Sequence, residues 1–170
     1  TELVDSMKNL PDAVLLIVGE GPERAVLEQQ AQSLGVADRV IFVGAVPPAE
    51  VPRYYALGDV FVSASTSEAQ GLTYIEAMAA GLPLLCHADP CLDALVREGE
   101  TGWAYHTPAE LAARAAALPK GPQLAAMQQT ARRAVQPYTK EQFGLSVVRL
   151  YAAALGRKYA ARSAAGGNVA

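Results

Sequence analysis

The sequence predicts an α/β fold in which a parallel sheet carries helices on both faces. Short, continuous apolar runs such as residues 14–18 are typical of strands that are buried on both sides. Segments with helical character alternate with these runs, and the loops between them are short. Alternation of this kind is expected to give right-handed crossovers, and therefore strands that run parallel to one another.

Glycine and proline separate the first predicted elements after a short helix that starts near Glu2. The strand at 14–18 leads into a turn at 19–22, where Pro22 suits the first turn of a helix. That helix is expected to end at Gly35, because glycine commonly terminates helices. The remaining expected elements of this half are a strand at 40–43, a short helix at 49–57 and a strand at 59–63.

The second half continues the alternation and then becomes helical. A helix at 72–80 precedes a fourth strand at 82–86, a helical piece at 92–96 and a short strand at 102–105. Three further helices are expected at 108–118, 123–135 and 140–159. We predict one domain over residues 1–160, followed by a disordered tail at 161–170 whose residues are small and polar.

Composition and charge narrow the class of protein. The 170 residues are 51% hydrophobic and 18% charged, which is typical of a soluble globular domain and not of a disordered chain. A net charge of -3 offers no general attraction for nucleic acid or for anionic lipid. No apolar run approaches the roughly 20 residues that span a bilayer. A chain that opens at Thr1 is expected to be part of something longer.

The two cysteines do not predict a metal site. Cys86 closes an apolar run and Cys91 lies in a loop, so we read both as buried or idle thiols. A metal would need more ligands at close spacing than His87 and His106 supply. Two free cysteines in a domain of this size fit a reducing compartment.

The most informative segment carries two glutamates around the start of the helix at 72–80. Glu68 lies in the loop before this helix, where its side chain is free to face the edge of the sheet. Glu76 lies about one turn into the helix among apolar residues, so we expect it to be largely buried and to need a polar partner. The alternative is that both are ordinary surface charges. Main-chain N–H groups of Gly71, Leu72 and Thr73 are unsatisfied at the helix start and suit an anion.

This arrangement predicts a site for a sugar nucleotide. The helix dipole and the free N–H groups would hold phosphate, while the carboxylates reach for hydroxyls. The hydroxyl of Thr73 could add to the anion site, but a capping or packing role explains this residue about as well. The loops at 19–22, 44–48 and 63–71 all follow strand ends, so they are expected to share the edge of the sheet where ligands bind.

The Gly19-x-Gly21 pair is an incomplete dinucleotide-binding fingerprint. It follows a strand and precedes a helix, but Ala25 and Val26 stand where a third glycine would be needed. We favour a tight strand-to-helix turn as the explanation of this pair. The other interpretation is a loop that lines a nucleotide cleft.

At this point the chain resembles a known family, the group 1 glycosyltransferases, which form the large retaining family 4 with the GT-B fold. The resemblance covers about residues 10–106 and rests on segments that occur in the family's order. These segments are PDAVLLIVGEGP at 11–22, VIFVG at 40–44, YALGDVFVS at 55–63, the element from Glu68 to Glu76 and GETG at 99–102. QGLTYIE at 70–76 and DPCLD at 89–93 look closer to the branch that glucosylates diacylglycerol.

The resemblance implies a role for each matching position. Glu68 would bind hydroxyls of the donor sugar near the reacting carbon, and Glu76 would bind the ribose of the nucleotide. The main chain at 71–73 would hold the diphosphate, and Val46 would hydrogen-bond the base. Gly19 is a further candidate for the donor cleft, on the incomplete fingerprint alone. The family implies a UDP-sugar or another nucleotide sugar as substrate, with no cofactor and no obligatory metal.

The sequence departs from the family pattern at several places. The segment Pro90-Cys91-Leu92-Asp93 replaces a glycine pair followed by Pro-Glu, and Gln70 stands where many members carry an aromatic residue. The family's diphosphate-binding Arg and Lys would precede the helix near Glu2, before the first residue of this sequence. The chain therefore resembles a C-terminal donor-binding half whose partner, the N-terminal acceptor-binding domain, is absent.

The resemblance also sets expectations for the intact protein. It implies transfer of a sugar to a lipid, saccharide or cell-envelope acceptor, in the cytoplasm or at the inner face of the membrane. Membrane contact would come only through the missing domain, and the chain alone would be inactive. The alternatives are a nucleotide-sugar 2-epimerase of the same fold and a non-catalytic Rossmann-like binding module.

Overall fold

The computed structural model describes residues 1–69 and 71–166 and divides into two compact units. The first unit is Thr1–Val135 and the second is Gln136–Ala170. The domain boundary predicted at residue 160 stays a prediction.

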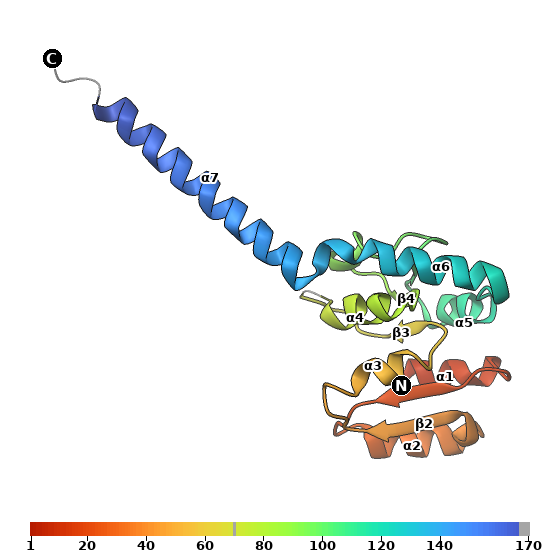
Figure 1. Cartoon of the computed structure of the whole chain (residues 1–170). Helices are drawn as coiled ribbons and strands as arrows, with labels where there is room; N and C mark the ends of the chain where they lie inside the picture. The colour runs from red at the N-terminus through yellow and green to blue at the C-terminus, as the bar shows by residue number, and fades with distance from the viewer. Residues whose placement is uncertain (70, 167–170) are drawn as a thin grey trace. The chain divides into compact units, whose positions relative to one another are not determined.

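The first unit contains five strands and the helices that accompany them (Figure 1). The strands are β1 (Leu15–Val18), β2 (Val40–Gly44), β3 (Phe61–Ser63), β4 (Leu84–His87) and β5 (Gly102–Tyr105). The α-helices are α1 (Glu2–Ser6), α2 (Arg24–Ser33), α3 (Val51–Tyr55), α4 (Leu72–Ala80), α5 (Pro108–Ala116) and α6 (Gly121–Ala134). Short 3-10 turns are η1 (Met7–Asn9), η2 (Ala37–Arg39) and η3 (Pro90–Leu92).

The predicted parallel pairing is confirmed, but the strands form two sheets instead of one. One sheet pairs β1 with β2 in parallel, and the other has the parallel order β3-β4-β5. In the larger sheet, Leu84 lies beside Phe61 on one side and Gly102 on the other. The apolar runs reveal which segments are strands, whereas neighbours depend on contacts between distant parts of the chain, so the division into two sheets was not predicted.

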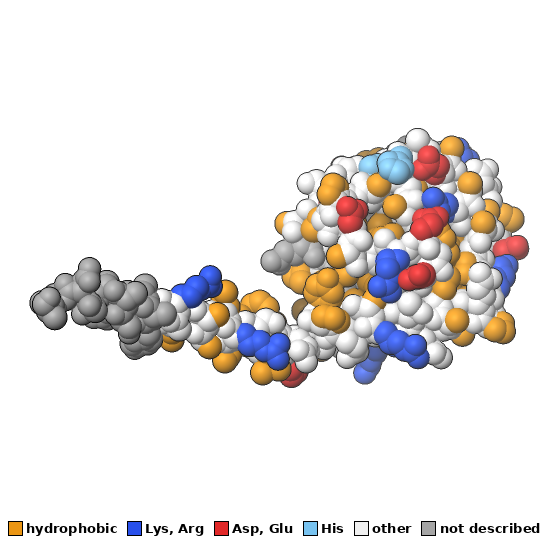
Figure 2. Space-filling model, turned by 90° about the horizontal axis from the view of Figure 1, so that it is seen from above, with side chains coloured by type: hydrophobic (Ala, Val, Ile, Leu, Met, Phe, Trp, Pro, Cys, Tyr) orange, Lys and Arg blue, Asp and Glu red, His pale blue; other side chains and the backbone are white. Residues whose placement is uncertain are grey.

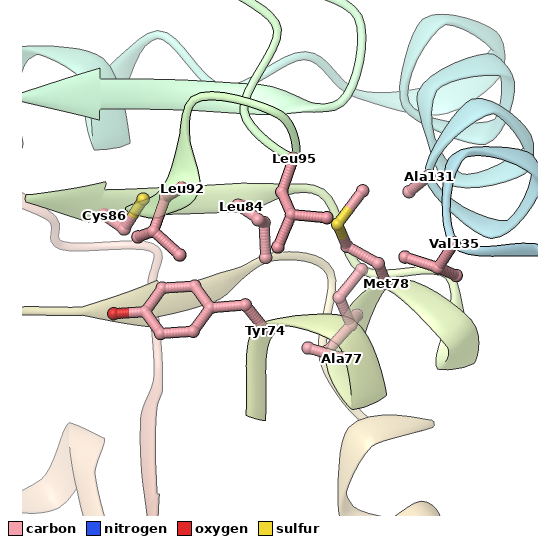
Figure 3. Packing of buried hydrophobic residues seen from close by; sticks show 10 residues of the cluster. Tyr74, Ala77, Met78, Leu84, Cys86, Leu92, Leu95, Ala131 and Val135 are labelled. Atoms are coloured by element: carbon pink, nitrogen blue, oxygen red, sulfur yellow. The ribbon is translucent and has the colours of Figure 1, made fainter. Parts of the chain in front are cut away.

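The three-stranded sheet is covered on both faces, as the sequence predicts. Leu84 and Cys86 belong to a buried cluster with α4 and α6 (Figure 3). The intervening Leu85 belongs to a different cluster with Leu111 of α5. Because alternate residues of a strand point to opposite faces, α4 and α6 cover one face and α5 covers the other.

The two-stranded sheet is covered less completely. Leu15 packs with Val4 of α1 and Ala31 of α2 in a separate buried cluster. By contrast, Val18 and Ile41 are exposed. Burial on both faces is therefore confirmed for the three-stranded sheet and only partial for the two-stranded one.

Gly102 shows how closely the strands of the larger sheet approach. A Cβ at this position would lie 2.3 Å from the carbonyl oxygen of Leu84 and 2.8 Å from its nitrogen. Only glycine leaves room for the neighbouring main chain.

The segment after β4 differs from the helical piece predicted at 92–96. The Asp89 side chain accepts a hydrogen bond from the N–H of Cys91, and the 3-10 turn η3 begins at Pro90. This side-chain cap starts the turn earlier than the apolar pattern suggested.

The second unit consists of a 3-10 turn, η4 (Gln136–Tyr138), and a long helix, α7 (Lys140–Gly166). The predicted disordered tail begins at 161, whereas the backbone is helical to Gly166; residues 167–170 lie outside the described part of the chain. Exposed apolar side chains, including Phe143 and Tyr151, share the surface of α7 with basic ones (Figure 2). Within the described ranges, no helix is both long and apolar enough to cross a membrane.

Candidate functional site

The start of α4 has a backbone conformation that requires glycine. Gly71 precedes the helix with a φ of 60° and a ψ of 39°, which is the left-handed region. A Cβ there would also lie 2.9 Å from Cδ2 of Leu92. Gly71 is buried, but Leu72 and Thr73 are exposed.

This helix start offers unpaired main-chain donors. Among the residues that the structure describes, none accepts a hydrogen bond from the N–H of Leu72 or Thr73. The next two donors, the N–H groups of Tyr74 and Ile75, both bond to the carbonyl of Gly71. The first turn of α4 therefore presents free N–H groups at the positive end of the helix dipole.

A groove of about 580 Å³ lies next to this helix, and we call it the α3–α4 groove. It is lined by Val46 and Pro48 from the loop after β2, by Tyr55 of α3 and by Glu76 of α4, together with Val51, Pro52, Ala79 and Ala80. The volume is in the range of small-molecule sites. Folding thus brings together Val46 and Glu76, to which the family resemblance gives the base and the ribose of one nucleoside.

Glu76 is exposed, which corrects the expectation that it is largely buried. Ala77 and Met78 fill the buried side of α4, while Leu72, Thr73 and Ala79 lie with Glu76 on the open side. The sequence was misleading because apolar residues occupy both sides of this helix. The exposed carboxylate faces the groove and not the core.

Tyr55 is the polar partner of Glu76. Its hydroxyl lies 3.3 Å from Oε2 of Glu76 and 3.4 Å from the carbonyl oxygen of Thr73. Partial burial, helped by the charge of Glu76, raises the pKa of Tyr55 to about 12. The phenol is therefore protonated at neutral pH and donates a hydrogen bond to the carboxylate.

Glu68 is half-buried and is held at two points. Its Oε1 accepts a hydrogen bond from the hydroxyl of Tyr74 at 3.2 Å. Its main-chain N–H donates to Oδ2 of Asp89 at 3.1 Å. The Tyr74 hydroxyl also contacts Oγ of Ser63, at the end of β3, at 2.8 Å. The loop that carries Glu68 is thereby bonded both to the core and to the loop after β4.

Gly19 lies at the end of β1 and does not line the α3–α4 groove. Its φ is 136°, and its N–H donates to the carbonyl oxygen of Gly44 at 2.9 Å. This contact is an isolated β-bridge that joins the ends of β1 and β2. The turn interpretation and the role in the donor cleft both stay predictions.

A second, much smaller cavity of about 60 Å³ lies beyond the end of β4, lined by His87, Asp89 and Asp93 among others. It also contains Cys86, whose pKa burial raises to about 12, so its thiol is unreactive near neutral pH. Cys91, in contrast, is exposed. In the described part of the chain, no group of three or more His, Cys, Asp and Glu residues could hold a metal ion.

Three side chains of the site were missed by sequence reasoning. Tyr55, Tyr74 and Asp89 received no functional role from the sequence. Each contacts a residue that is distant in the sequence or lies across a loop, so no local pattern marks it. A hydroxyl at the otherwise apolar position 74 was the one available signal, because a buried phenol needs a hydrogen-bond partner.

Comparisons with known proteins give a consistent picture. Residues 1–134 match the family described as "Glycosyl transferases group 1". The chain is 36% identical to the alpha-monoglucosyldiacylglycerol synthase of Acholeplasma laidlawii over 149 residues, which are 87% of this chain and 37% of that protein. It is 34% identical over 107 residues to a GDP-mannose-dependent alpha-(1-6)-phosphatidylinositol monomannoside mannosyltransferase of Mycolicibacterium smegmatis, covering 59% of this chain and 28% of that protein.

The fold is shared with solved glycosyltransferases. The sucrose-phosphate synthase of Thermosynechococcus elongatus superposes with a TM-score of 0.80 and 30% identity over 92% of this chain and 42% of that one. These comparisons confirm the predicted Rossmann-like fold of GT-B proteins. The chain spans about a third of the length of the two curated relatives.

Proposed function

Because the chain belongs to the group 1 glycosyl transferases, we propose that it is the donor-binding domain of a retaining glycosyltransferase. In the intact enzyme, a nucleotide sugar would lie across the strand ends with its nucleoside in the α3–α4 groove. The observation that carries this proposal is the meeting of Val46 and Glu76 in a groove of about 580 Å³.

The proposed position of the diphosphate follows from the free donors of α4. The N–H groups of Leu72 and Thr73 lie in the same helix as Glu76, one turn before it. Main-chain donors at a helix N-terminus favour phosphate, and they would also stabilise the negative charge that develops as the diphosphate leaves. The left-handed Gly71 fixes the direction in which this first turn begins.

Glu68 would lie on the sugar side of the diphosphate. Its carboxylate would accept hydrogen bonds from donor hydroxyls near the reacting carbon, where positive charge develops in the transition state. The proposal assigns Glu68 to sugar binding and catalysis and Glu76 to ribose binding. It includes no cofactor, because the nucleotide sugar is a substrate.

The relatives support the chemical class of donor and acceptor. One of them is named as GDP-mannose-dependent, and both are named for products or substrates that are glycolipids. We therefore propose a nucleotide diphosphate sugar as donor, with UDP-sugars as the first to test, and a lipid, saccharide or cell-envelope acceptor. The acceptor would be bound by an N-terminal domain in the cytoplasm or at the inner face of the membrane, so the chain alone would not turn over.

Ribose binding by Glu76 can be tested directly with UDP. Changing Glu76→Gln removes the charge but keeps the side-chain length, and we expect UDP affinity to fall about tenfold, which is the effect of losing a hydrogen bond to a charged group. Isothermal titration or ligand-observed NMR measures the change. Glu141→Gln is the matched control, because Glu141 is an exposed helical glutamate of the second unit.

The control must leave UDP affinity unchanged. Equal UDP affinity of the Glu76→Gln variant and the original chain would contradict the proposal and favour a non-catalytic binding module. Robust sugar transfer by the 170-residue chain alone would contradict the division of labour between two domains.

A further inference from the structure

Tyr74 connects the buried core to the loop that carries Glu68. The residue is 1% exposed, and its ring meets the ring of Phe61 edge-on with 5.3 Å between centroids. In Figure 3 the ring lies within the cluster beside Leu92 and Cys86, and its hydroxyl points toward the carboxyl end of β4. The core therefore fixes the position of this phenol.

The Tyr74 hydroxyl ends within reach of Glu68. It lies 3.2 Å from Oε1 of Glu68 and 2.8 Å from Oγ of Ser63. An ionised carboxylate has no hydrogen, so the phenol is the donor in the contact with Glu68. Burial raises the pKa of Tyr74 to about 12, and the donor is therefore present throughout the neutral range.

Glu68 needs such a contact because its own segment provides little support. Thr66, Ser67 and Ala69 beside it are exposed. The bond from its N–H to Asp89 holds the main chain but leaves the side-chain torsions free. Among the described residues, only the Tyr74 hydroxyl donates a hydrogen bond to this carboxylate, through Oε1, so Oε2 has no protein donor.

We propose that Tyr74 is a positioning residue that holds the Glu68 carboxylate in the orientation in which it binds the donor sugar. This inference rests on the proposed function, since it assigns Glu68 to the sugar. One oxygen of the carboxylate is fixed by the phenol and the other is left to accept from a sugar hydroxyl. Without the phenol, Glu68 would have to be ordered each time a donor binds.

The consequence is selective for the sugar part of the donor. Ordering a flexible side chain weakens binding by roughly three- to tenfold. The loss should appear with UDP-glucose and be absent with UDP, which lacks the transferred sugar that Glu68 would contact. A general loss of stability would weaken both ligands alike.

The experiment compares Tyr74→Phe with Tyr105→Phe in the 170-residue chain. Tyr105 is equally buried, and its hydroxyl also makes two contacts, to Oε1 of Glu2 at 2.6 Å and to the carbonyl oxygen of Ser63 at 3.1 Å. Both variants lose a buried hydroxyl, but only Tyr74→Phe loses a contact to Glu68. Ligand-observed NMR titrations would give the affinity ratio of UDP-glucose to UDP for each.

We expect Tyr74→Phe to lower this ratio three- to tenfold and Tyr105→Phe to preserve it. Glu68→Gln should lower the ratio, and adding Tyr74→Phe to it should have no further effect. Ser63→Ala, which removes the second hydroxyl at the phenol, provides another route if Tyr74→Phe does not fold, and should change the ratio in the same direction.

The outcomes separate the two proposals. An unchanged ratio in Tyr74→Phe and Ser63→Ala, or an equal change in Tyr105→Phe, would overturn the positioning role. If Glu76→Gln still weakened UDP binding, the proposed function would survive that result. Failure of the original chain to bind either ligand at millimolar concentration would overturn both.

Discussion

The two sheets of the first unit end in different kinds of structure. The strands β1 and β2 end at glycines, and the N–H of Gly19 bonds to the carbonyl of Gly44. The strands β3 and β4 instead lead to polar side chains that contact one another, among them Ser63 and Asp89. Both glutamates of the candidate site, Glu68 and Glu76, follow β3 in the sequence. The three-stranded sheet is therefore the one that positions the carboxylates of the site.

This difference between the two sheets parallels a difference in how deeply their strands are buried. In β4, Leu84, Leu85 and Cys86 are all buried, whereas Leu15 is the only buried residue of β1. A rigid, covered sheet can hold side chains in single orientations, which a catalytic or binding group requires. We infer that the two-stranded sheet contributes main chain and apolar surface to the groove. The three-stranded sheet would position the polar side chains that contact the ligand.

The largest expected effect is on the three-stranded sheet itself. Gly102→Ala places a Cβ against the main chain of Leu84, so β4 and β5 must separate, and we expect a loss of about 3 kcal/mol in the free energy of unfolding. Urea denaturation measures it. Gly21→Ala, with no atom within 4 Å of the added Cβ, is the control in the other half of the unit and should be nearly neutral.

A smaller effect is expected at the turn that opens α4. Gly71→Ala meets both a left-handed φ and a contact of 2.9 Å with Leu92, whereas Gly19→Ala meets only the backbone strain of its φ of 136°. Left-handed strain amounts to about 1–2 kcal/mol, so Gly71→Ala should lose more than this and Gly19→Ala about this much. Equal losses in denaturation experiments would show that the surroundings of Gly71 are no tighter than those of Gly19.

Alkaline pH should weaken the three-stranded region through its phenols. Burial raises the pKa of Tyr74 to about 12 and also raises the pKa of Tyr105, from an ordinary value of 10.0. Above pH 10 the unfolded chain releases these protons while the folded chain keeps them, so the free energy of unfolding falls as pH rises.

Urea titrations at pH 9 and pH 11 would measure this fall. Tyr74→Phe should make it shallower, because one phenol no longer contributes. A fall that is identical in the variant would show that Tyr74 ionises as easily in the folded protein as in the unfolded one.

The smallest effect is expected on the two-stranded side. Arg24 of α2 bonds to Glu20 and Glu28, and both partners are largely exposed. Exposed ion pairs contribute little and are screened by salt. Arg24→Ala should therefore leave the denaturation midpoint nearly unchanged in 0.15 M salt, and a large shift would place important packing on the β1–β2 side.

Sequence was informative where a physical requirement is local. The bounds of α4 agree with the predicted 72–80, because glycine turns at 71 and 81 mark both ends. The roles of Glu68 and Glu76 came from the resemblance to a family.

The sequence did not predict features that depend on contacts between distant residues. The split into two sheets, the exposed side of Glu76 and the phenol at Glu68 all arise from packing between separate segments. Tyr55 and Glu76, for example, lie on different helices, and only the fold brings them within 3.3 Å. Residue type alone cannot show which side of an apolar helix is open.

The central claim is that a diphosphate binds at the free N–H groups of Leu72 and Thr73. A titration of the ¹⁵N-labelled chain with UDP, read by the chemical shifts of the backbone amides, tests it most directly. We predict that the largest shifts fall on these two amides, with smaller ones at Val46 and Glu76. Binding that shifts other amides and leaves Leu72 and Thr73 unchanged would contradict the account.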